Sequence, residues 1–342
     1  MAERLAVIMP AWNAADYIES SVRSVLEQTH RELRLIVVDD GSTDRTPEIL
    51  ARLAAEDERL TVMRVPNGGP AMARNRALDA LGDTADYVMF LDADDLLDPD
   101  AADYALSAAR KGAEFVIFGF RIVRPDGSAR EYCEKEELLD RASLGGSLAR
   151  LYKANLLNQV WGKLFAAPLL KEIRFPDYRW GEDRLFLFDV LGSVRRLAVL
   201  PACRHSYRMH PGESLIKSWY DRKFAVAVEI DRRMEALCRE FSVPDDADFR
   251  YMFAKSVFSC LTNLYSRSCR LTKAEKRAAA RRIGNDERVQ RRCRDASGGL
   301  PTGLLCAVLR SRRVSLTLFC FRLVAWAGER FPRLFTRIKH KK

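Results

Sequence analysis

Short apolar runs alternate with amphipathic segments along the first part of the chain. The apolar runs have the length of buried strands, and the amphipathic segments place apolar residues at helical spacing. A strand, a helix and a second strand within roughly forty residues form a βαβ unit, which favours an α/β fold with a mostly parallel sheet flanked by helices. Pro10 is expected to close the first strand. We predict strands at residues 4–9, 33–38, 60–65, 87–91 and 115–123, and helices at residues 15–28, 46–55, 70–81 and 100–111.

The pattern changes to helices from about residue 221 onward. Amphipathic helices are predicted at residues 224–241 and 249–265, and a basic helical segment, broken at Gly284, at residues 274–294. Residues 302–327 are apolar, but four arginines interrupt them, so no uncharged run is long enough to cross a membrane. The same residues are compatible with a helix that lies on a membrane surface. We assign no elements to residues 124–180.

The net charge of +10 is unevenly distributed along the chain. Acidic residues outnumber basic ones over residues 1–216, whereas residues 217–342 carry a large excess of Lys and Arg. Clustered acids suit a cation site, and a basic surface suits an anionic partner. We therefore expect two parts with different roles, an α/β domain at residues 1–216 and a helical basic region at residues 217–342.

The eight cysteines form no CxxC pair, and their spacing fits no zinc site. The first residues have one short apolar stretch, which is shorter than the core of a secretory signal. We expect a cytoplasmic protein with reduced thiols.

A short acidic segment, Asp92-Ala93-Asp94-Asp95, follows the strand predicted at residues 87–91. Carboxylates this close together repel one another unless a cation or hydrogen-bond donors compensate them. Mg²⁺ commonly takes one or two protein carboxylates and completes its shell with substrate phosphates. The alternative is an exposed acidic turn that caps the next helix. The position favours a ligand site, because ligands of open α/β sheets bind beyond the carboxyl ends of the strands.

Two further segments follow the first and second strands. In VVDDGSTD, residues 37–44, Asp40 is placed to accept hydrogen bonds from a base or ribose, although the same residues also favour a plain turn. In MPAWN, residues 9–13, Trp12 offers an aromatic face to a base or sugar. Backbone groups around Pro10 and Ala11 are then expected to pair with the edge of that ligand. A buried structural Trp is the alternative.

Three other segments carry candidate chemistry. Arg74 follows the Asn67-Gly68-Gly69 turn and is placed to balance a diphosphate, although a plain helix start fits equally; the spacing is not that of a P-loop. Glu182 and Asp183 lie between aromatic and apolar residues, where a shielded carboxylate keeps the basicity to accept a proton. They also fit acids at a helix N-terminus. His210 is a candidate metal or phosphate ligand, although a lone His in a loop is usually solvated.

Taken together and in this order, these segments resemble family 2 glycosyltransferases with the GT-A (Rossmann-like) fold, of the type that builds bacterial surface polysaccharides. The resemblance covers about residues 3–215 and leaves the basic helical region unexplained. It rests on MPAWN at 9–13, QT at 28–29, VVDDGSTD at 37–44, NGG at 67–69 with ARN at 73–75, FLDADD at 90–95, WGKLF at 161–165 and GED at 181–183.

The resemblance implies a UDP-sugar donor and an inverting displacement. Asp183 would be the general base, and Glu182 would orient it or the acceptor. Asp92 and Asp94 match the DxD motif, which binds ribose and a Mn²⁺ or Mg²⁺ ion, with His210 as a further candidate metal ligand. The expected nucleotide-sugar contacts are Pro10, Ala11, Trp12, Asn13, Asp40, Gly68, Arg74, Asp92, Ala93 and Asp94.

The basic helical region has several interpretations. Its pairing of Arg and Lys with Leu, Phe and Trp over residues 310–342 suits anionic lipid headgroups, which would hold the protein at the inner face of the membrane near a glycan or lipid-linked acceptor. A basic face that packs on the catalytic domain is the alternative. A nucleic-acid binder with a non-catalytic domain is a third interpretation, but no recognition motif is present and the acidic domain would repel nucleic acid. A nucleotidyltransferase would need a Gly-rich loop and a Lys near the N-terminus, which are missing. The arginines that would suit phosphates are Arg281, Arg282, Arg288, Arg291, Arg292 and Arg294.

Overall fold

The computed structural model describes residues 3–210, 218–244, 247–294 and 299–330. The chain divides into two compact units, Met1–Pro211 and Gly212–Lys342. The predicted boundary between residues 216 and 217 lies outside the described residues, as do residues 331–342 of the basic segment discussed above.

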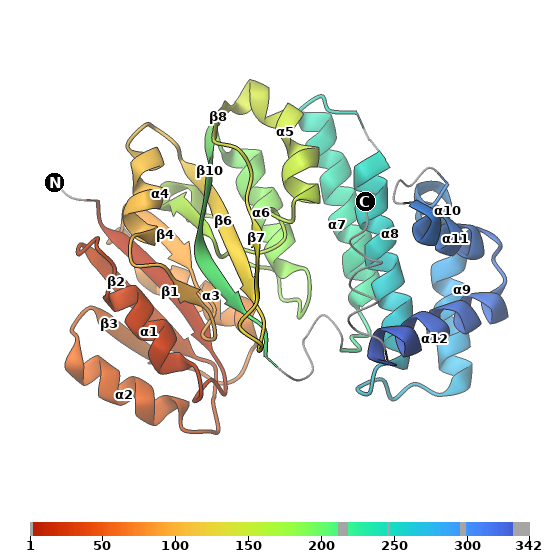
Figure 1. Ribbon diagram of the computed structural model, residues 1–342, viewed down its shortest axis with the longest axis horizontal. Helices are drawn as coiled ribbons and strands as arrows, with labels where there is room; N and C mark the ends of the chain where they lie inside the picture. Colours follow the sequence, from red (N-terminus) through yellow and green to blue (C-terminus); the bar gives the residue numbers. More distant parts are fainter. Residues whose placement is uncertain (1–2, 211–217, 245–246, 295–298, 331–342) are drawn as a thin grey trace. The chain divides into compact units, whose positions relative to one another are not determined.

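A sheet forms the centre of the first unit (Figure 1). In the described part of this unit ten strands join, in the order β3-β2-β1-β4-β9-β6-β10-β5, with β7 on β6 and β8 on β10. The strands are β1 (Leu5–Ala11), β2 (Leu33–Asp39), β3 (Leu60–Arg64), β4 (Tyr87–Phe90), β5 (Leu96–Leu97), β6 (Phe115–Val123), β7 (Ala129–Tyr132), β8 (Glu137–Asp140), β9 (Lys163–Ala166) and β10 (Arg196–Arg208).

The expected α/β class is confirmed, and the sheet is mixed. Strands β3, β2, β1 and β4 run parallel, as do β6 and β10, whereas β9 is antiparallel to both β4 and β6. The helices of this unit are α1 (Ile18–Leu26), α2 (Thr46–Glu56), α3 (Pro70–Leu81), α4 (Ala101–Ala109), α5 (Arg141–Lys153) and α6 (Glu182–Ser193), with a short 3₁₀ turn at Ala167–Leu170. The first nine predicted elements are all present, with ends shifted by a few residues.

The prediction that Pro10 closes the first strand is wrong, because β1 continues to Ala11. Ile8 and Pro10 direct their backbone toward β4, but pairing with β4 stops at Ile8, whose carbonyl accepts from Leu91 N. Pro10 therefore lacks an N–H only where no partner strand needs one.

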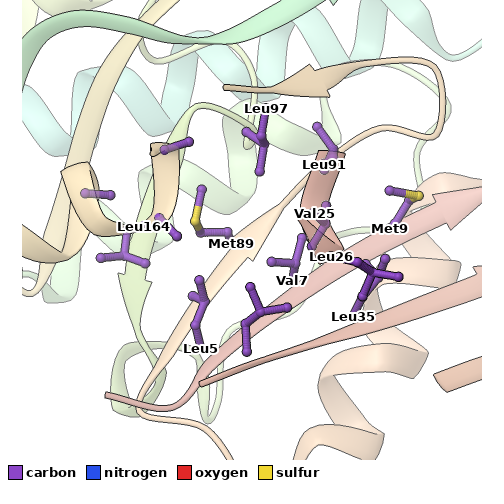
Figure 2. Packing of buried hydrophobic residues seen from close by; sticks show 14 of the residues in the cluster. Leu5, Val7, Met9, Val25, Leu26, Leu35, Met89, Leu91, Leu97 and Leu164 are labelled. Atoms are coloured by element: carbon purple, nitrogen blue, oxygen red, sulfur yellow. The ribbon is translucent and has the colours of Figure 1, made fainter. Parts of the chain in front are cut away.

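The core of the first unit explains why β1 is apolar throughout. Every residue of β1 is buried, and Leu5, Val7 and Met9 pack with Val25 of α1 and Met89 of β4 (Figure 2). A strand buried on both faces needs apolar side chains at consecutive positions. Each such side chain stabilises the fold by about 1.5–3 kcal/mol through burial.

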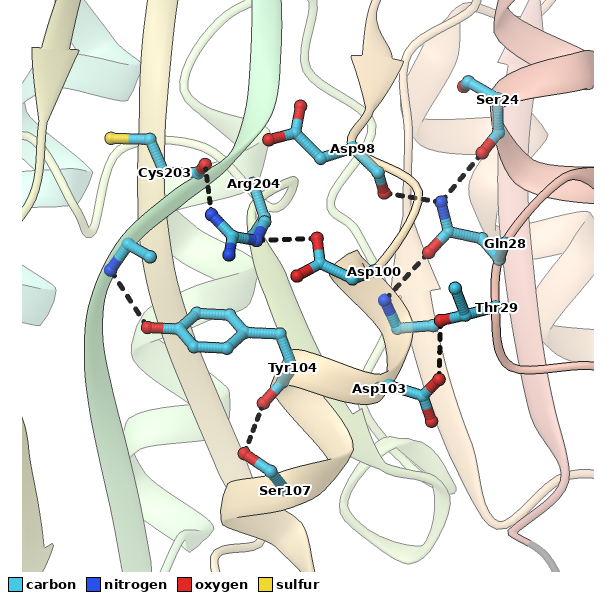
Figure 3. A network of polar contacts seen from close by, with 12 residues as sticks. Ser24, Gln28, Thr29, Asp98, Asp100, Asp103, Tyr104, Ser107, Cys203 and Arg204 are labelled. Atoms are coloured by element: carbon cyan, nitrogen blue, oxygen red, sulfur yellow. Dashed lines mark hydrogen bonds and ion pairs between the residues drawn. The ribbon is translucent and has the colours of Figure 1, made fainter.

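The Gln28-Thr29 pair braces α1 against α4 (Figure 3). The fully buried amide of Gln28 donates to Asp98 O at 2.7 Å and accepts from Ala102 N at 2.9 Å. Thr29 Oγ1 donates to Asp103 Oδ2 at 2.6 Å. These bonds hold the start of α4 against α1. Gln28 and Thr29, which belong to the family resemblance, therefore have a packing role behind the acidic turn.

The second unit is helical in its described part. It contains α7 (Lys223–Glu240), α8 (Ala247–Thr262), α9 (Lys273–Asn285), α10 (Glu287–Arg292), α11 (Gly299–Arg310) and α12 (Val314–Arg330), with a 3₁₀ turn at Asn263–Tyr265. The predicted break in the basic segment follows Gly284, and the segment at 302–327 forms two helices. None of the helices among the described residues is long and apolar enough to cross a membrane.

Part of the basic segment is occupied by acids of the same unit. Arg292, which is 1% exposed, pairs with Asp231 at 2.7 Å, and Arg288 pairs with Asp231 and Glu235 at 2.5 and 2.7 Å. Arg291 also reaches Glu235, at 3.1 Å. These three arginines stabilise the helical unit, which weakens the case that the segment presents a row of phosphate contacts.

Candidate functional site

The candidate residues gather at the carboxyl ends of the parallel strands. Trp12 follows β1, Asp40 follows β2, and Asp92 and Asp94 follow β4. Because neighbouring parallel strands end at the same edge of a sheet, these residues share one side of the first unit. Arg74 reaches this edge from the first half of α3.

Arg74 joins the acidic turn to the start of α6. Its guanidinium, which is 4% exposed, pairs with Asp92 Oδ1 at 2.7 Å and with Asp183 Oδ1 at 3.0 Å, and Glu182 Oε1 lies at 3.9 Å. A buried charge is stable only when it is paired. The charge of the buried Arg74 is therefore compensated by Asp92 and Asp183. The structure brings together Asp92, Arg74 and Asp183, which the sequence predicted as residues of one site.

Glu182 and Asp183 form the first turn of α6, so they are helix N-terminal acids as well as site residues. Burial raises the pKa of Asp183, and the ion pair with Arg74 opposes that rise. Burial and the nearby Asp183 charge raise the pKa of Glu182 to about 8. Asp183 Oδ2 also accepts from Val160 N at 3.3 Å. The arrangement holds a shielded carboxylate with more basicity than a solvated aspartate has.

Lys163 is an additional buried charge near these acids. Its side chain is 1% exposed, and Nζ donates to Trp161 O at 3.2 Å. Burial lowers the pKa of Lys163 to about 7, and the Asp183 carboxylate acts in the opposite direction. Lys163 belongs to the WGKLF segment of the family resemblance, but no role was predicted for it from the sequence.

Asp40 contacts the glycine turn that precedes α3. Its carboxylate is buried and accepts from Gly68 N at 2.8 Å and Gly69 N at 2.7 Å, while Asn67 Nδ2 donates to Asp40 O at 2.9 Å. Gly69 has φ of +88°, which side chains rarely tolerate. The structure thus brings together Asp40 and Gly68, two residues that the sequence predicted separately as nucleotide contacts. A carboxylate oxygen can accept more than one hydrogen bond.

Trp12 and Asn13 are both exposed, but they differ in their contacts within the protein. Trp12 is 57% exposed, so the alternative of a buried structural Trp is wrong. Asn13, at φ of +48°, accepts from Thr43 N at 2.8 Å through Oδ1 and donates its own N–H to Ser42 Oγ at 2.9 Å. Asn13 therefore fastens the turn after β2. Pro10 and Ala11 are buried, and Ala11 O accepts from Asp40 N at 2.8 Å.

Asp94 and His210 face each other at the same edge. Nε2 of His210 lies 3.4 Å from Asp94 Oδ2 and has no hydrogen-bond partner among the described residues, and the imidazole stacks on Tyr17 with ring centroids 3.9 Å apart. Burial, together with the charges of Asp95 and Asp92, raises the pKa of Asp94 to about 6. A carboxylate that disfavours its own charge beside an unpartnered imidazole nitrogen suits a divalent cation.

Asp92, the third residue of the expected metal set, turns one oxygen toward Arg74. Ala93 between them is buried. Within the described residues no group of three or more His, Cys, Asp or Glu side chains is arranged to hold a metal ion. A cation at Asp94 and His210 would therefore need further ligands from a bound molecule, as Mg²⁺ commonly takes from phosphates.

A fully buried pair, Asp95 and His205, clamps the end of β10 to the acidic turn. His205 Nε2 lies 2.9 Å from Asp95 Oδ2, and Asp95 Oδ1 accepts from Arg208 N at 3.0 Å. Burial lowers the pKa of His205 to about 3, so its imidazole is neutral, and the ring stacks on Trp161 with centroids 4.2 Å apart. The clamp positions the strand end that carries His210.

Arg208 adds to this clamp. Its guanidinium donates to Asp94 O, and also to Ser20 Oγ at 3.0 Å and Ser21 Oγ at 3.1 Å on α1. The guanidinium of Arg208 is thus engaged by contacts within the protein. No sequence pattern singled out His205, since its partner Asp95 is 110 residues away.

Comparison with protein families matches residues 6–165 to the family described as glycosyl transferase family 2. Over 126 residues the chain is 40% identical to TuaG, a glycosyltransferase of Bacillus subtilis (strain 168) ascribed to teichuronic acid biosynthesis, covering 36% of this chain and 49% of TuaG. The chain spans about a third to a half of the length of the curated relatives that it matches first.

Solved structures share the fold. The structure of S. aureus TarS residues 1–349 in complex with UDP-GlcNAc is similar with a TM-score of 0.67 at 20% identity, over 95% of this chain and 91% of that chain. The mannosyltransferase PcManGT from Pyrobaculum calidifontis, in complex with GDP-Man and Mn²⁺, is similar with a TM-score of 0.52 at 19% identity, over 97% of this chain and 88% of that chain. The expected GT-A fold is thereby confirmed.

Proposed function

We propose that the chain transfers a sugar from a nucleotide-sugar donor to an acceptor hydroxyl of a cell-surface glycan or polysaccharide, because residues 6–165 match glycosyl transferase family 2. The observation that carries the proposal is the buried Arg74, which pairs with Asp92 of the acidic turn on one side and with Asp183 on the other. The guanidinium of Arg74 thus holds Asp92, the candidate donor-binding acid, near Asp183, the candidate base.

The donor is expected at the edge formed by β1, β2 and β4. The exposed ring of Trp12 offers a stacking face to the base, and Asp40 retains lone pairs for its edge. Pro10, Ala11 and Gly68 would line the same position with backbone groups, as the family resemblance implies. The complex of TarS with UDP-GlcNAc supports a uridine donor for this chain.

The side chains at Asp94 and His210 fit Mn²⁺ or Mg²⁺, because they offer a carboxylate oxygen and an imidazole nitrogen 3.4 Å apart, and that nitrogen has no hydrogen-bond partner in the part of the chain that the structure describes. When bound there together with a nucleotide diphosphate, such an ion would offset the negative charge of the leaving diphosphate. The Mn²⁺ in the PcManGT complex supports this assignment. Asp92 is placed to bind the ribose or the ion if a ligand displaces part of its pair with Arg74.

Asp183 is the candidate general base. It would take the proton of the acceptor hydroxyl while that oxygen bonds to the anomeric carbon of the donor. The bond from the anomeric carbon to the diphosphate oxygen breaks on the opposite face, and the diphosphate leaves with the electron pair, so the anomeric configuration inverts. Glu182, with its raised pKa, stays protonated near neutrality and can donate a hydrogen bond to the acceptor or to Asp183.

We expect the protein to act in the cytoplasm, at the inner face of the membrane, on a glycan or lipid-linked acceptor. The match to TuaG supports a surface polysaccharide as the product. A role in nucleic-acid binding is less favoured, because Arg288, Arg291 and Arg292 pair with acids of their own unit.

The test compares Asp183→Asn with the wild-type chain. A screen of nucleotide sugars with Mn²⁺, following release of the nucleoside diphosphate, first identifies the donor. Transfer by Asp183→Asn should then fall by at least about 10²-fold, since that is the usual contribution of a general base, while UDP affinity stays within about twofold. Asp79→Asn, a change at an exposed carboxylate on α3 that pairs with Arg174, is the control and should transfer normally. Unchanged transfer by Asp183→Asn, or a matching loss of UDP binding, would contradict the role of Asp183.

A further inference from the structure

Helix α12 presents a row of large apolar side chains to solvent. Leu316, Phe319, Leu323 and Trp326 are 39, 62, 47 and 56% exposed. Residues spaced by three and four positions lie on one face of a helix, so these four side chains form a continuous stripe, which we call the α12 face. Soluble surfaces normally expose such residues singly.

The opposite side of α12 accounts for its packing. Phe321 and Thr317 are buried, and the ring centroids of Phe321 and of Phe258 on α8 lie 5.6 Å apart. Tyr265 donates its hydroxyl hydrogen to Leu318 O at 2.8 Å. The helix is therefore held in the second unit by its buried side, and the core of that unit does not require the α12 face to be apolar.

Arginines surround the α12 face. Arg312 and Arg313 precede the helix, and Arg322 and Arg330 are exposed on it. Arg277 of α9 adds a charge beside the start of the helix, because its Nη1 lies 3.4 Å from Ser315 Oγ. In the sequence of Val314–Arg330 the only acid is Glu329. An aromatic and aliphatic stripe bordered by cations matches the chemistry of a bilayer surface, where acyl chains lie beneath anionic headgroups.

We propose that the α12 face inserts into the interfacial layer of a bilayer that contains anionic lipid. Leu316, Phe319, Leu323 and Trp326 would contact the acyl boundary, while the surrounding arginines bind headgroup phosphates. The helix would lie in the plane of the membrane, consistent with the finding that no described helix can cross it. A second copy of the chain fits less well, because the two arginine borders would then repel each other.

This inference specifies a surface for the membrane partner of the proposed function, and it rests on that function only for the benefit of proximity to a lipid-linked acceptor. The binding itself needs no donor and no acceptor. The experiment therefore measures co-sedimentation of the full chain with vesicles of phosphatidylcholine, alone or with phosphatidylglycerol, in the absence of substrates.

Two double variants test the two components of the surface. Phe319→Ser with Leu323→Ser removes apolar area, and Arg313→Glu with Arg322→Glu reverses charge. Each should lower the partition coefficient on phosphatidylglycerol vesicles at least tenfold. Leu138→Ser, on β8 at 46% exposure, and Arg232→Glu, on α7 at 65% side-chain exposure, are the matched controls and should bind like the wild type.

Three outcomes would overturn the proposal. The first is wild-type binding to phosphatidylcholine that equals binding to phosphatidylglycerol vesicles. The second is unchanged binding by either double variant. The third is self-association of the wild type without vesicles that Phe319→Ser with Leu323→Ser abolishes, which would identify a second copy as the occupant. Donor hydrolysis measured in parallel separates this result from the proposed function, because a folded chain that binds vesicles but never cleaves a nucleotide sugar would count against the function alone.

Discussion

At the scale of single residues, the site depends on one cation among several acids. Arg74 is buried and contacts both Asp92 and Asp183. Burial raises the pKa of Asp183, which favours the protonated form, whereas Arg74 favours the charged form. Asp183 therefore has a pKa above that of a solvated aspartate, ~3.9, and its carboxylate is a stronger base than that of a solvated aspartate.

The pH dependence of transfer should reveal this balance. A base works only when it is deprotonated, so kcat should fall as the pH drops through the raised pKa of Asp183. In Arg74→Met the opposing cation is lost, the pKa of Asp183 rises further, and the acid limb of the kcat profile should move to higher pH. Arg76→Met, a change at an exposed arginine of the same helix, should leave the profile in place. An acid limb that stays or moves to lower pH in Arg74→Met would refute this account.

At the scale of elements, the site depends on how the end of β10 meets the turn after β4. The metal candidates, Asp94 and His210, follow the ends of β4 and β10, two strands from distant parts of the chain. The buried pair of Asp95 and His205, together with Arg208, holds these two segments against each other. His205 is a positioning residue in this view, because it touches no candidate ligand and acts through Asp95.

Removing the clamp should loosen the binding of the metal-nucleotide complex. His205→Ala leaves Asp95 buried with one oxygen unpaired, which destabilises the acidic turn by about 1–3 kcal/mol. Because this turn also contains Asp94, the affinity for UDP with Mn²⁺ should fall roughly tenfold. His205→Gln keeps a side-chain N–H for Asp95 and should recover most of that affinity. Titration calorimetry of UDP with and without Mn²⁺ measures the effect. His30→Ala, which removes a buried imidazole bonded to Glu3 O, is the control. Equal losses in His205→Ala and His30→Ala would mean that the effect is general destabilisation.

At the scale of the whole molecule, charge divides between the two units. The first contains the acidic edge, and the second contains the basic helices with their own buried ion pairs. Asp231 and Arg292 are nearly inaccessible to solvent and lie 2.7 Å apart. Such a pair contributes little compared with apolar packing, but breaking it leaves an uncompensated buried charge.

Asp231→Ala should therefore destabilise the chain strongly. The expected loss in the free energy of unfolding is about 3–5 kcal/mol, the usual cost of removing one partner of a buried pair. Denaturation by urea, followed by circular dichroism, measures it. Glu229→Ala removes an acid of the same helix whose partner Arg232 is exposed, and it should change stability by at most about 1 kcal/mol. Comparable losses in the two variants would contradict the structural role of the Asp231 pair.

Much of the architecture follows from local sequence patterns. The apolar runs and helical spacings predicted the strands and helices of the first 123 residues except the short strand β5, because burial of a parallel strand demands consecutive apolar side chains. The acids that follow the second and fourth of those strands lie at one edge of the sheet, as predicted, because the carboxyl ends of parallel strands meet there. Residues 124–180 were not assigned, because β7 is a polar edge strand and β9 acquires its place only by pairing with β4 and β6.

The sequence by itself determined which residue types stand at the strand ends, and hence the class of chemistry, since strand periodicity and turn composition are local properties. Only the tertiary structure decided which of them meet. Arg74 and Asp183 are 109 residues apart, Asp95 and His205 are 110 apart, and Asp40 bonds to Gly68 and Gly69. The packed side of α12 likewise depends on α8, so its exposed side could be recognised only after folding. Such contacts result from strand pairing and helix packing over long separations, which no local pattern encodes.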